Sequence, residues 1–109
     1  MRILSGRYAF RAFLLLSATC GGSSAIPYAT RDQLSNAQAR WPDTTSASLD
    51  DGRELFVARC SGCHPLPSPE RFGFQRWHSI LDTMGERARL TGAERELVLR
   101  YLTAVGRRD

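Results

Sequence analysis

The chain of 109 residues contains no lysine, so all fifteen of its Lys/Arg cations are arginines. It shows no pattern typical of β-strands and no internal repeat, which favours an all-helical domain. The apolar run over residues 12 to 18 is too short to span a bilayer, because a membrane-spanning helix needs about 20 apolar residues. A core of this size is marginal, so we expect a disulfide, metal or cofactor to help to stabilise it.

The net charge of +4 does not indicate a nucleic-acid-binding protein. Arg2, Arg7 and Arg11 supply three of the positive charges, and no acidic residue precedes residue 26. Removal of residues 1 to 25 would therefore leave a net charge of +1. We expect no nucleic acid as a partner, and partner choice must depend on local charged patches.

Residues 1 to 25 are typical of a secretory signal peptide. Arginines precede the apolar run, small and polar residues follow it, and Ser23 and Ala25 satisfy the small-x-small rule for cleavage before Ile26. This pattern predicts export to the periplasm.

Cys20 offers an alternative to a freely diffusing product. It follows the apolar run and precedes Gly-Gly-Ser-Ser, and in this it resembles the acylated cysteine of bacterial lipoproteins. Ser17 and Thr19 depart from that motif, so we favour a soluble periplasmic protein. Membrane association is expected only if Cys20 carries lipid.

The remaining chain divides into two parts. Residues 26 to 47 are rich in Pro, Ser, Thr, Asn and Asp, which favours an irregular arm or linker with at most one short turn around residues 32 to 40. Trp41 is the one residue of this arm that we expect to pack on the domain. Residues 48 to 109 form the predicted domain.

Three helices are predicted in this domain. The first covers about residues 50 to 60, with Ser48 and Asp51 spaced as a capping box. The second covers about residues 74 to 84, where apolar residues recur at helical spacing, and Gly85 is placed to end it.

The third predicted helix begins after Thr91, whose hydroxyl can cap it while Glu94 reaches back. It continues through an apolar stripe to a stop near Gly106. The fold class that these patterns predict is all-α.

Residues 60 to 64 read Cys-Ser-Gly-Cys-His, which is the attachment pattern of c-type haem. Cys60 and Cys63 lie about one helical turn apart, which matches the two vinyl groups that the thiols alkylate. His64 then falls beneath the iron as an axial nitrogen ligand. The pattern predicts one covalently bound haem c.

Other sites that use paired cysteines fit the chain less well. A thioredoxin-like dithiol requires a strand before the helix, and none is predicted. A zinc site needs four separated ligands, and only Cys20 and His78 remain to complete a set. A disulfide between Cys60 and Cys63 is compatible with an oxidising compartment, but it gives His64 no role.

Two further pairs of residues surround the motif. Gly52 and Phe56 lie eight and four residues before the first cysteine, and Val98 and Tyr101 lie three apart in the third helix. In this pattern residues 49 to 104, about half of the chain, resemble the cytochrome c family. The resemblance implies a compact cytochrome c fold, with three main helices around one covalently bound haem. It also implies that the helices cross at Gly52, where a missing side chain lets the backbones approach.

The resemblance also implies a methionine as the second axial ligand. Met1 would leave with the signal segment, so the candidate is Met84, twenty residues after His64. Together with Arg71, Glu94 and Tyr101, Trp77 and Met84 form a pattern similar to that of compact bacterial haem domains. Trp77 shares the helical face of Met84 and is expected to contact the haem.

Two alternatives to Met84 ligation stay open. A methionine on an apolar stripe can simply fill the core. His78 is the rival ligand, although it lies off the stripe and is expected at the surface.

The loop that follows the haem motif contains Pro65, Pro67 and Pro69. A rigid loop of this kind can offer a carbonyl oxygen to the Nδ1–H of the histidine. Arg71, Arg76 and the Trp77 indole are candidate partners for the haem propionates.

The ligand set that is implied favours a single-electron carrier and not an enzyme in its own right. Its partners would be redox proteins: a terminal oxidase, or a dehydrogenase of which the chain is the haem subunit, such as a sulfite-oxidising molybdenum enzyme. The alternatives are a gas-binding or sensory haem protein with a labile sixth ligand, and a haemless structural or interaction module. We expect a mainly monomeric protein whose folding depends on the haem.

Overall fold

The computed structural model describes residues 25 to 108, and within that range every regular element is helical. The elements are α1 (Arg31–Arg40), α2 (Ser46–Cys60), a short 3-10 helix η1 (Pro69–Arg71), α3 (Phe74–Arg87) and α4 (Gly92–Val105). The all-α prediction is confirmed. Apart from Ala25, the predicted signal segment, Cys20 included, lies outside the described residues. Within them, no helix has the length and apolar character needed to cross a membrane.

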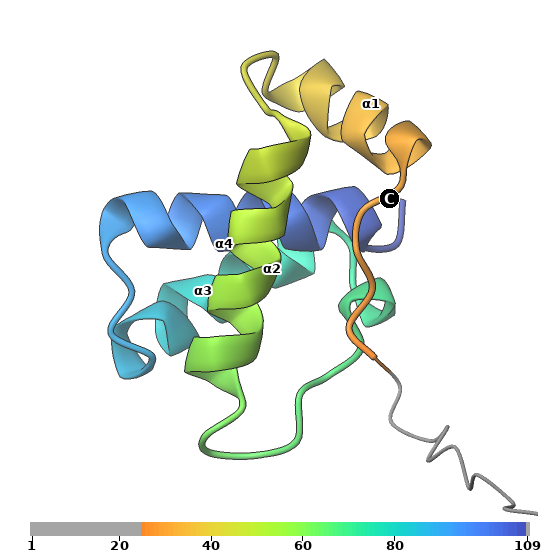
Figure 1. Cartoon of the computed structure of the whole chain (residues 1–109). Coiled ribbons are helices and arrows are strands. Elements are labelled where there is room, and N and C mark those ends of the chain that lie inside the picture. The colour runs from red at the N-terminus through yellow and green to blue at the C-terminus, as the bar shows by residue number, and fades with distance from the viewer. Residues whose placement is uncertain (1–24, 109) are drawn as a thin grey trace, which may run out of the picture.

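Helices α2 and α4 cross at the centre of the molecule (Figure 1). A Cβ atom at Gly52 would lie 2.8 Å from the carbonyl carbon of Leu97 and 2.9 Å from the Cβ of Tyr101, so only glycine fits at the crossing. Val98 and Tyr101 are both fully buried. The close approach at Gly52 is therefore confirmed.

Helix α1 corrects the prediction for residues 26 to 47. The prediction of an irregular arm is wrong over Arg31–Arg40, which is helical. At the start of this helix the side chains of Thr30 and Gln33 form a reciprocal capping box. The helix buries only Ala37, so its apolar stripe is too narrow to be recognised in the sequence. Trp41, at its C-terminal end, packs against the core as expected.

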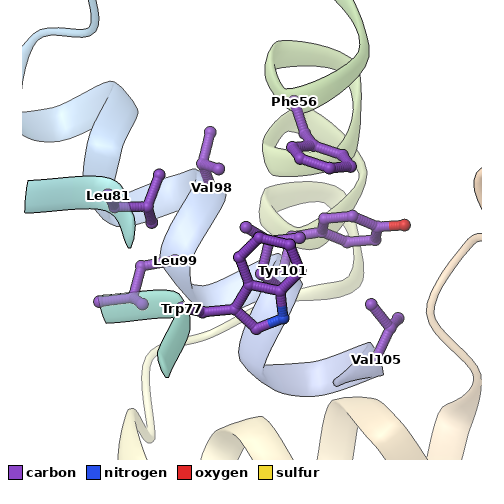
Figure 2. Close-up of a cluster of buried hydrophobic side chains, with 8 residues drawn as sticks. Phe56, Trp77, Leu81, Val98, Leu99, Tyr101 and Val105 are labelled. Atoms are coloured by element: carbon purple, nitrogen blue, oxygen red, sulfur yellow. The ribbon is translucent and has the colours of Figure 1, made fainter. Parts of the chain in front are cut away.

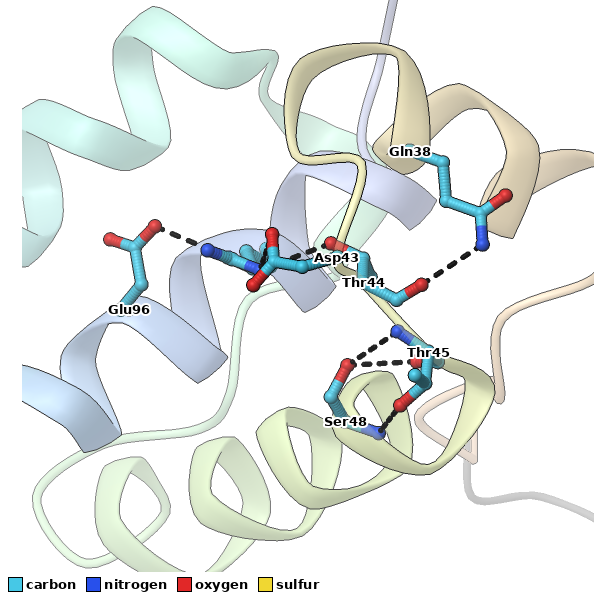
Figure 3. A network of polar contacts seen from close by, with 7 residues as sticks. Gln38, Asp43, Thr44, Thr45, Ser48 and Glu96 are labelled. Atoms are coloured by element: carbon cyan, nitrogen blue, oxygen red, sulfur yellow. Dashed lines mark hydrogen bonds and ion pairs between the residues drawn. The ribbon is translucent and has the colours of Figure 1, made fainter.

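Helix α2 begins earlier than predicted. Its N-cap is Thr45, not Ser48, and Ser48 is the residue that returns the capping hydrogen bond (Figure 3). The Gln38 amide donates to the carbonyl of Thr44 at 2.9 Å and joins α1 to this start (Figure 3). The predicted Ser48–Asp51 capping box is wrong because the helix starts earlier, and Ser48 takes the third helical position that glutamate or glutamine usually holds in such a box. The end of α2 at Cys60 is confirmed.

Helix α3 passes through Gly85 and ends at Arg87, so the prediction that Gly85 ends it is wrong. The chain leaves the helix at Arg89, which adopts a φ of 55°. The N–H of Leu90 donates to the carbonyl of Gly85, and the N–H of Arg89 donates to the carbonyl of Glu86, both at 3.0 Å. This pair of bonds is a Schellman motif, formed here with an arginine in the left-handed position.

Helix α4 is bounded as predicted. Thr91 caps its start in a reciprocal capping box with Glu94, and Gly106 follows its last residue. Its buried residues begin at Val98 and continue to Val105, so the C-terminal part of the helix packs in the core.

The core fills the space between α2, α3 and α4 (Figure 2). Three aromatic rings lie in it: Phe56 packs edge-on against Trp77 with ring centroids 6.1 Å apart, and the Tyr101 ring lies 6.3 Å from that of Phe56. The segment before α1, residues 25 to 29, lies against this core and is called the N-terminal strap below. Two hydrogen bonds hold it: the Tyr101 hydroxyl donates to the carbonyl of Pro27, and Arg53 Nε donates to the carbonyl of Ile26 at 2.8 Å. The remaining members of the cluster are Leu81, Val98, Leu99, Leu102 and Val105.

Candidate functional site

The cysteine motif lies at the C-terminal end of α2. Cys60 is the last residue of the helix and is half-buried, whereas Cys63 and His64 are exposed in the turn that follows. Both cysteines are free thiols. Burial raises the pKa of the Cys60 thiol, which favours its neutral, protonated form.

The ring of His64 is oriented by the loop that follows it. Nδ1 of His64 lies 3.0 Å from the carbonyl oxygen of Pro65. A carbonyl oxygen can only accept, so in the neutral ring Nδ1 carries the hydrogen and Nε2 carries the lone pair. The expectation that the proline-rich loop supplies a carbonyl is confirmed, and Pro65 is the residue that supplies it.

One apolar pocket, with a volume of about 160 Å³, lies between the end of α2, the loop and α3. All five of the predicted site residues line it: Cys60, Cys63, His64, Trp77 and Met84. Its remaining walls are mostly aliphatic and aromatic, from Phe56, Pro67, Ile80, Leu81, Ala88 and Leu102. The pocket thus brings two thiols, an imidazole and a thioether to one apolar space.

Met84 and His78 lie in different surroundings on α3. Met84 lines the pocket with 37% of its surface exposed. The side chain of His78 is 45% exposed, pairs with Asp82 at 3.5 Å and does not line the pocket. His78 therefore lies off the stripe of Met84, as expected.

Trp77 forms a wall of the pocket, but its polar atom faces elsewhere. The side chain is 1% exposed, and its indole N–H donates to the carbonyl oxygen of Pro69 at 2.9 Å. The indole hydrogen is therefore already used within the protein. In this structure the indole offers no free hydrogen to a propionate, and Trp77 contacts the pocket through its ring.

The arginines named as candidate propionate partners lie outside the pocket lining. Arg71 and Arg76 do not line it, and their guanidinium groups lie over the ring of Phe72 at 5.4 and 5.7 Å. The cations that do line it are Arg59 and Arg87, and no carboxylate among the described residues joins them. The sequence carried a signal for both, because Arg59 precedes Cys60 and Arg87 lies three residues after Met84.

Arg59 also joins the motif to the start of α4. Its guanidinium donates to the carbonyl of Arg89 and to the carboxylate of Glu94, each at 3.2 Å. The pKa of Glu94 is lowered, first by its hydrogen bond to the Thr91 backbone and then by the charge of Arg59. The end of α2 is therefore held against the turn between α3 and α4.

The alternative sites find no support between residues 25 and 108. No group of three or more His, Cys, Asp or Glu side chains in this range is arranged to hold a metal ion, so a zinc cluster is not formed there. The same range contains no strand that could precede a thioredoxin-like dithiol. A larger cleft of about 510 Å³, between the N-terminal strap and the proline-rich loop, has Glu70 as its one ionisable side chain and offers no comparable set of donors.

Comparisons of the chain with family models, with curated proteins and with solved structures find no match. The residues of the pocket therefore carry the indication of function.

Proposed function

We propose that the chain is a single-electron carrier of the compact cytochrome c type. One haem c would be attached through Cys60 and Cys63 and ligated by His64 and Met84, with Trp77 against its face. The observation that carries the proposal is that one apolar pocket is lined by both thiols, the imidazole and the thioether. The geometry of His64 supports it independently, because the lone pair of Nε2 is free for a metal.

The residues of the pocket fit a c-type haem chemically. Both cysteines are free thiols, as the attachment requires. Each S–H would add across one vinyl group, so that sulfur bonds to one vinyl carbon and the hydrogen is transferred to the other. The aliphatic and aromatic walls suit the apolar faces of a porphyrin.

A bound haem would supply a one-electron couple between ferric and ferrous iron. The protein would supply two ligands, His64 and Met84, and mostly apolar walls. A thioether ligand stabilises the ferrous state, which favours a fairly high reduction potential. With both axial positions taken by side chains, the chain would transfer electrons and would not bind a substrate at the metal.

The cellular setting is part of the same proposal. Residues 1 to 25 would direct the protein to the periplasm, where haem is attached to exported chains. In the alternative, a lipoprotein signal would end before Cys20, and lipid on that residue would keep the protein at a membrane. Its partners would be redox proteins, either a terminal oxidase reached by diffusion or a dehydrogenase that holds the chain as a haem subunit. We propose a mainly monomeric state.

The exposure of Met84 favours a second candidate, a gas-binding or sensory haem protein. A ligand that is 37% exposed on the last turns of a helix can be displaced more readily than a buried one. Carbon monoxide binding to the reduced protein separates the two functions. Slow and incomplete binding supports the carrier, and rapid, complete binding supports the sensor.

The test of the axial ligands uses optical spectra of protein exported in cells that have haem-attachment machinery. The oxidised wild type should show the weak far-red band that is characteristic of sulfur ligation. Met84→Ala should lose this band, and the matched variant His78→Ala, on the same helix, should keep it. A haem-loaded wild type without the band would refute Met84 as the ligand.

A further inference from the structure

Apolar packing secures only part of helix α3. Its buried residues are Trp77, Leu81 and Gly85, and of these only Gly85 lies in the last turn. The side chains of Thr83, Met84, Glu86 and Arg87 are exposed. The last turn of α3, which carries Met84, must therefore be held in place by something other than a buried apolar side chain.

Arg95 of α4 makes three contacts along one face of α3. The Cδ and Cγ atoms of Arg95 lie 3.8 and 3.9 Å from the position that a Cβ of Gly85 would take, so its stem covers this glycine. Its Nη2 donates to the Asp82 carboxylate and, at 3.4 Å, to the carbonyl oxygen of His78. The contacts cover two turns of α3.

These contacts lie on a different face of α3 from the pocket. Successive residues of a helix turn by about 100°, so His78, Asp82 and Gly85 share one face. Trp77 and Met84 fall on another, which lines the pocket. Arg95 does not line the pocket, and any effect that it has on Met84 must pass through the helix.

We infer that Arg95 is a positioning residue, which fixes the rotation of α3 about its axis and thereby directs the thioether of Met84 into the pocket. This inference depends on the proposed function, since it assigns a role in holding the sixth ligand. An ion pair at this exposure adds little to global stability, because the side chain of Asp82 is 59% exposed and that of Arg95 is 25% exposed. Loss of Arg95 should therefore change the ligation by Met84 more than the free energy of unfolding.

The experiment compares two Arg→Met variants of α4 in the haem-loaded, full-length protein. Arg95→Met keeps the stem over Gly85 and removes the guanidinium. Arg100→Met is the matched control, because Arg100 pairs with Asp43 at 3.0 Å and with Glu96 at 3.2 Å, away from α3. Figure 3 shows these two carboxylates beside α4.

Arg95→Met should weaken the far-red band and speed carbon monoxide binding to the ferrous protein by up to about fivefold, which corresponds to the loss of one surface ion pair. Asp82→Asn should have a similar but smaller effect, because the carbonyl of His78 still accepts from Arg95. Arg95→Lys keeps the positive charge and should therefore retain more of the band than Arg95→Met does. Arg100→Met should leave the band and the binding rate as in the wild type.

Equal behaviour of Arg95→Met and Arg100→Met in both measurements would overturn the inference, provided that the wild type shows the band. A wild type that carries no haem, or that carries haem without the band, would instead overturn the proposed function or its sixth ligand, and the inference with it. Thermal melts of the two variants should shift by similar amounts. A change of ligation confined to Arg95→Met then reports positioning and not general destabilisation.

Discussion

The buried indole of Trp77 donates its hydrogen to the carbonyl oxygen of Pro69 at 2.9 Å and so joins α3 to the end of the proline-rich loop. Pro69 ends the loop whose first proline, Pro65, orients His64. Trp77 lies on the helix that carries Met84. A single hydrogen bond thus connects the segments that bear the two proposed axial ligands.

Trp77→Phe tests this connection. The variant keeps an aromatic ring in the core but leaves the carbonyl of the buried Pro69 without its partner. An unsatisfied buried acceptor costs about 1–3 kcal/mol, so the free energy of unfolding should fall by that amount. Urea titration followed by circular dichroism measures the change. A variant as stable as the wild type would show that the bond does not hold the loop.

Gly52→Ala tests the crossing of α2 and α4. The added methyl would lie 2.9 Å from the Cβ of Tyr101 and closer still to the backbone of Leu97, so the helices must move apart. Overpacking of this kind costs about 1–3 kcal/mol. The control is Gly92→Ala, where a Cβ has no neighbour within 4 Å, and it should be neutral or slightly stabilising. Equal stability of both variants would contradict the crossing.

The double variant Cys60→Ser, Cys63→Ser tests whether folding depends on the haem. Phe56, Leu81 and Leu102 line the pocket, so part of the core faces the space that the haem would fill. Without covalent attachment, we expect a largely unfolded chain with weak helical signal in far-ultraviolet circular dichroism. The matched variant Ser61→Ala, within the same motif, should fold normally. A cooperative, native-like melt of the double variant would refute this dependence.

Tyr101 makes stability sensitive to alkaline pH. Burial raises the pKa of its phenol from 10.0 to about 12, because the folded protein disfavours the charged form. The stabilisation is therefore complete below pH 10, where the unfolded chain also holds the proton, and it is lost as the pH rises towards 12. The drop in the urea midpoint between pH 9 and pH 11 should be smaller in Tyr101→Phe than in the wild type. Parallel losses in both proteins would assign the pH dependence to another group.

The predicted elements that the structure confirms are those with strong local signals. Helix α4 has both a capping box at Thr91 and a broad apolar stripe, and its bounds were predicted closely. The crossing at Gly52 followed from a resemblance to a known family and is confirmed by the space around that residue. In both cases the local pattern and the tertiary contacts favour the same structure.

The errors arose where tertiary contacts or unusual caps decide the structure. Helix α1 is mostly polar, and its stability depends on Thr30 at its start and on the burial of Ala37 against the core formed with α4. Gly85 was interpreted as a helix end, whereas it is buried under the stem of Arg95, the helix ends at Arg87 and the left-handed residue is Arg89. Sequence patterns alone do not show which glycine meets a neighbour.

The sequence motifs of the candidate site lead to residues that lie together in the structure. The motif at residues 60 to 64 and the spacing of Trp77 and Met84 identified five residues that the structure places on one pocket. The arginines were predicted less well, because a long cationic side chain can extend in several directions from its helix. Arg59 and Arg87 lie close in sequence to Cys60 and Met84, but the packing of α2 and α3 decides that their side chains line the pocket.

The most direct test of the account is the mass of the polypeptide after export in cells that attach haem, measured under denaturing conditions. We predict a coloured protein whose mass exceeds that of its amino acids by one haem, with the haem retained after denaturation because two thioether bonds hold it. A colourless protein whose mass equals that of its amino acids alone would contradict the assignment of Cys60 and Cys63, and with it the proposed function.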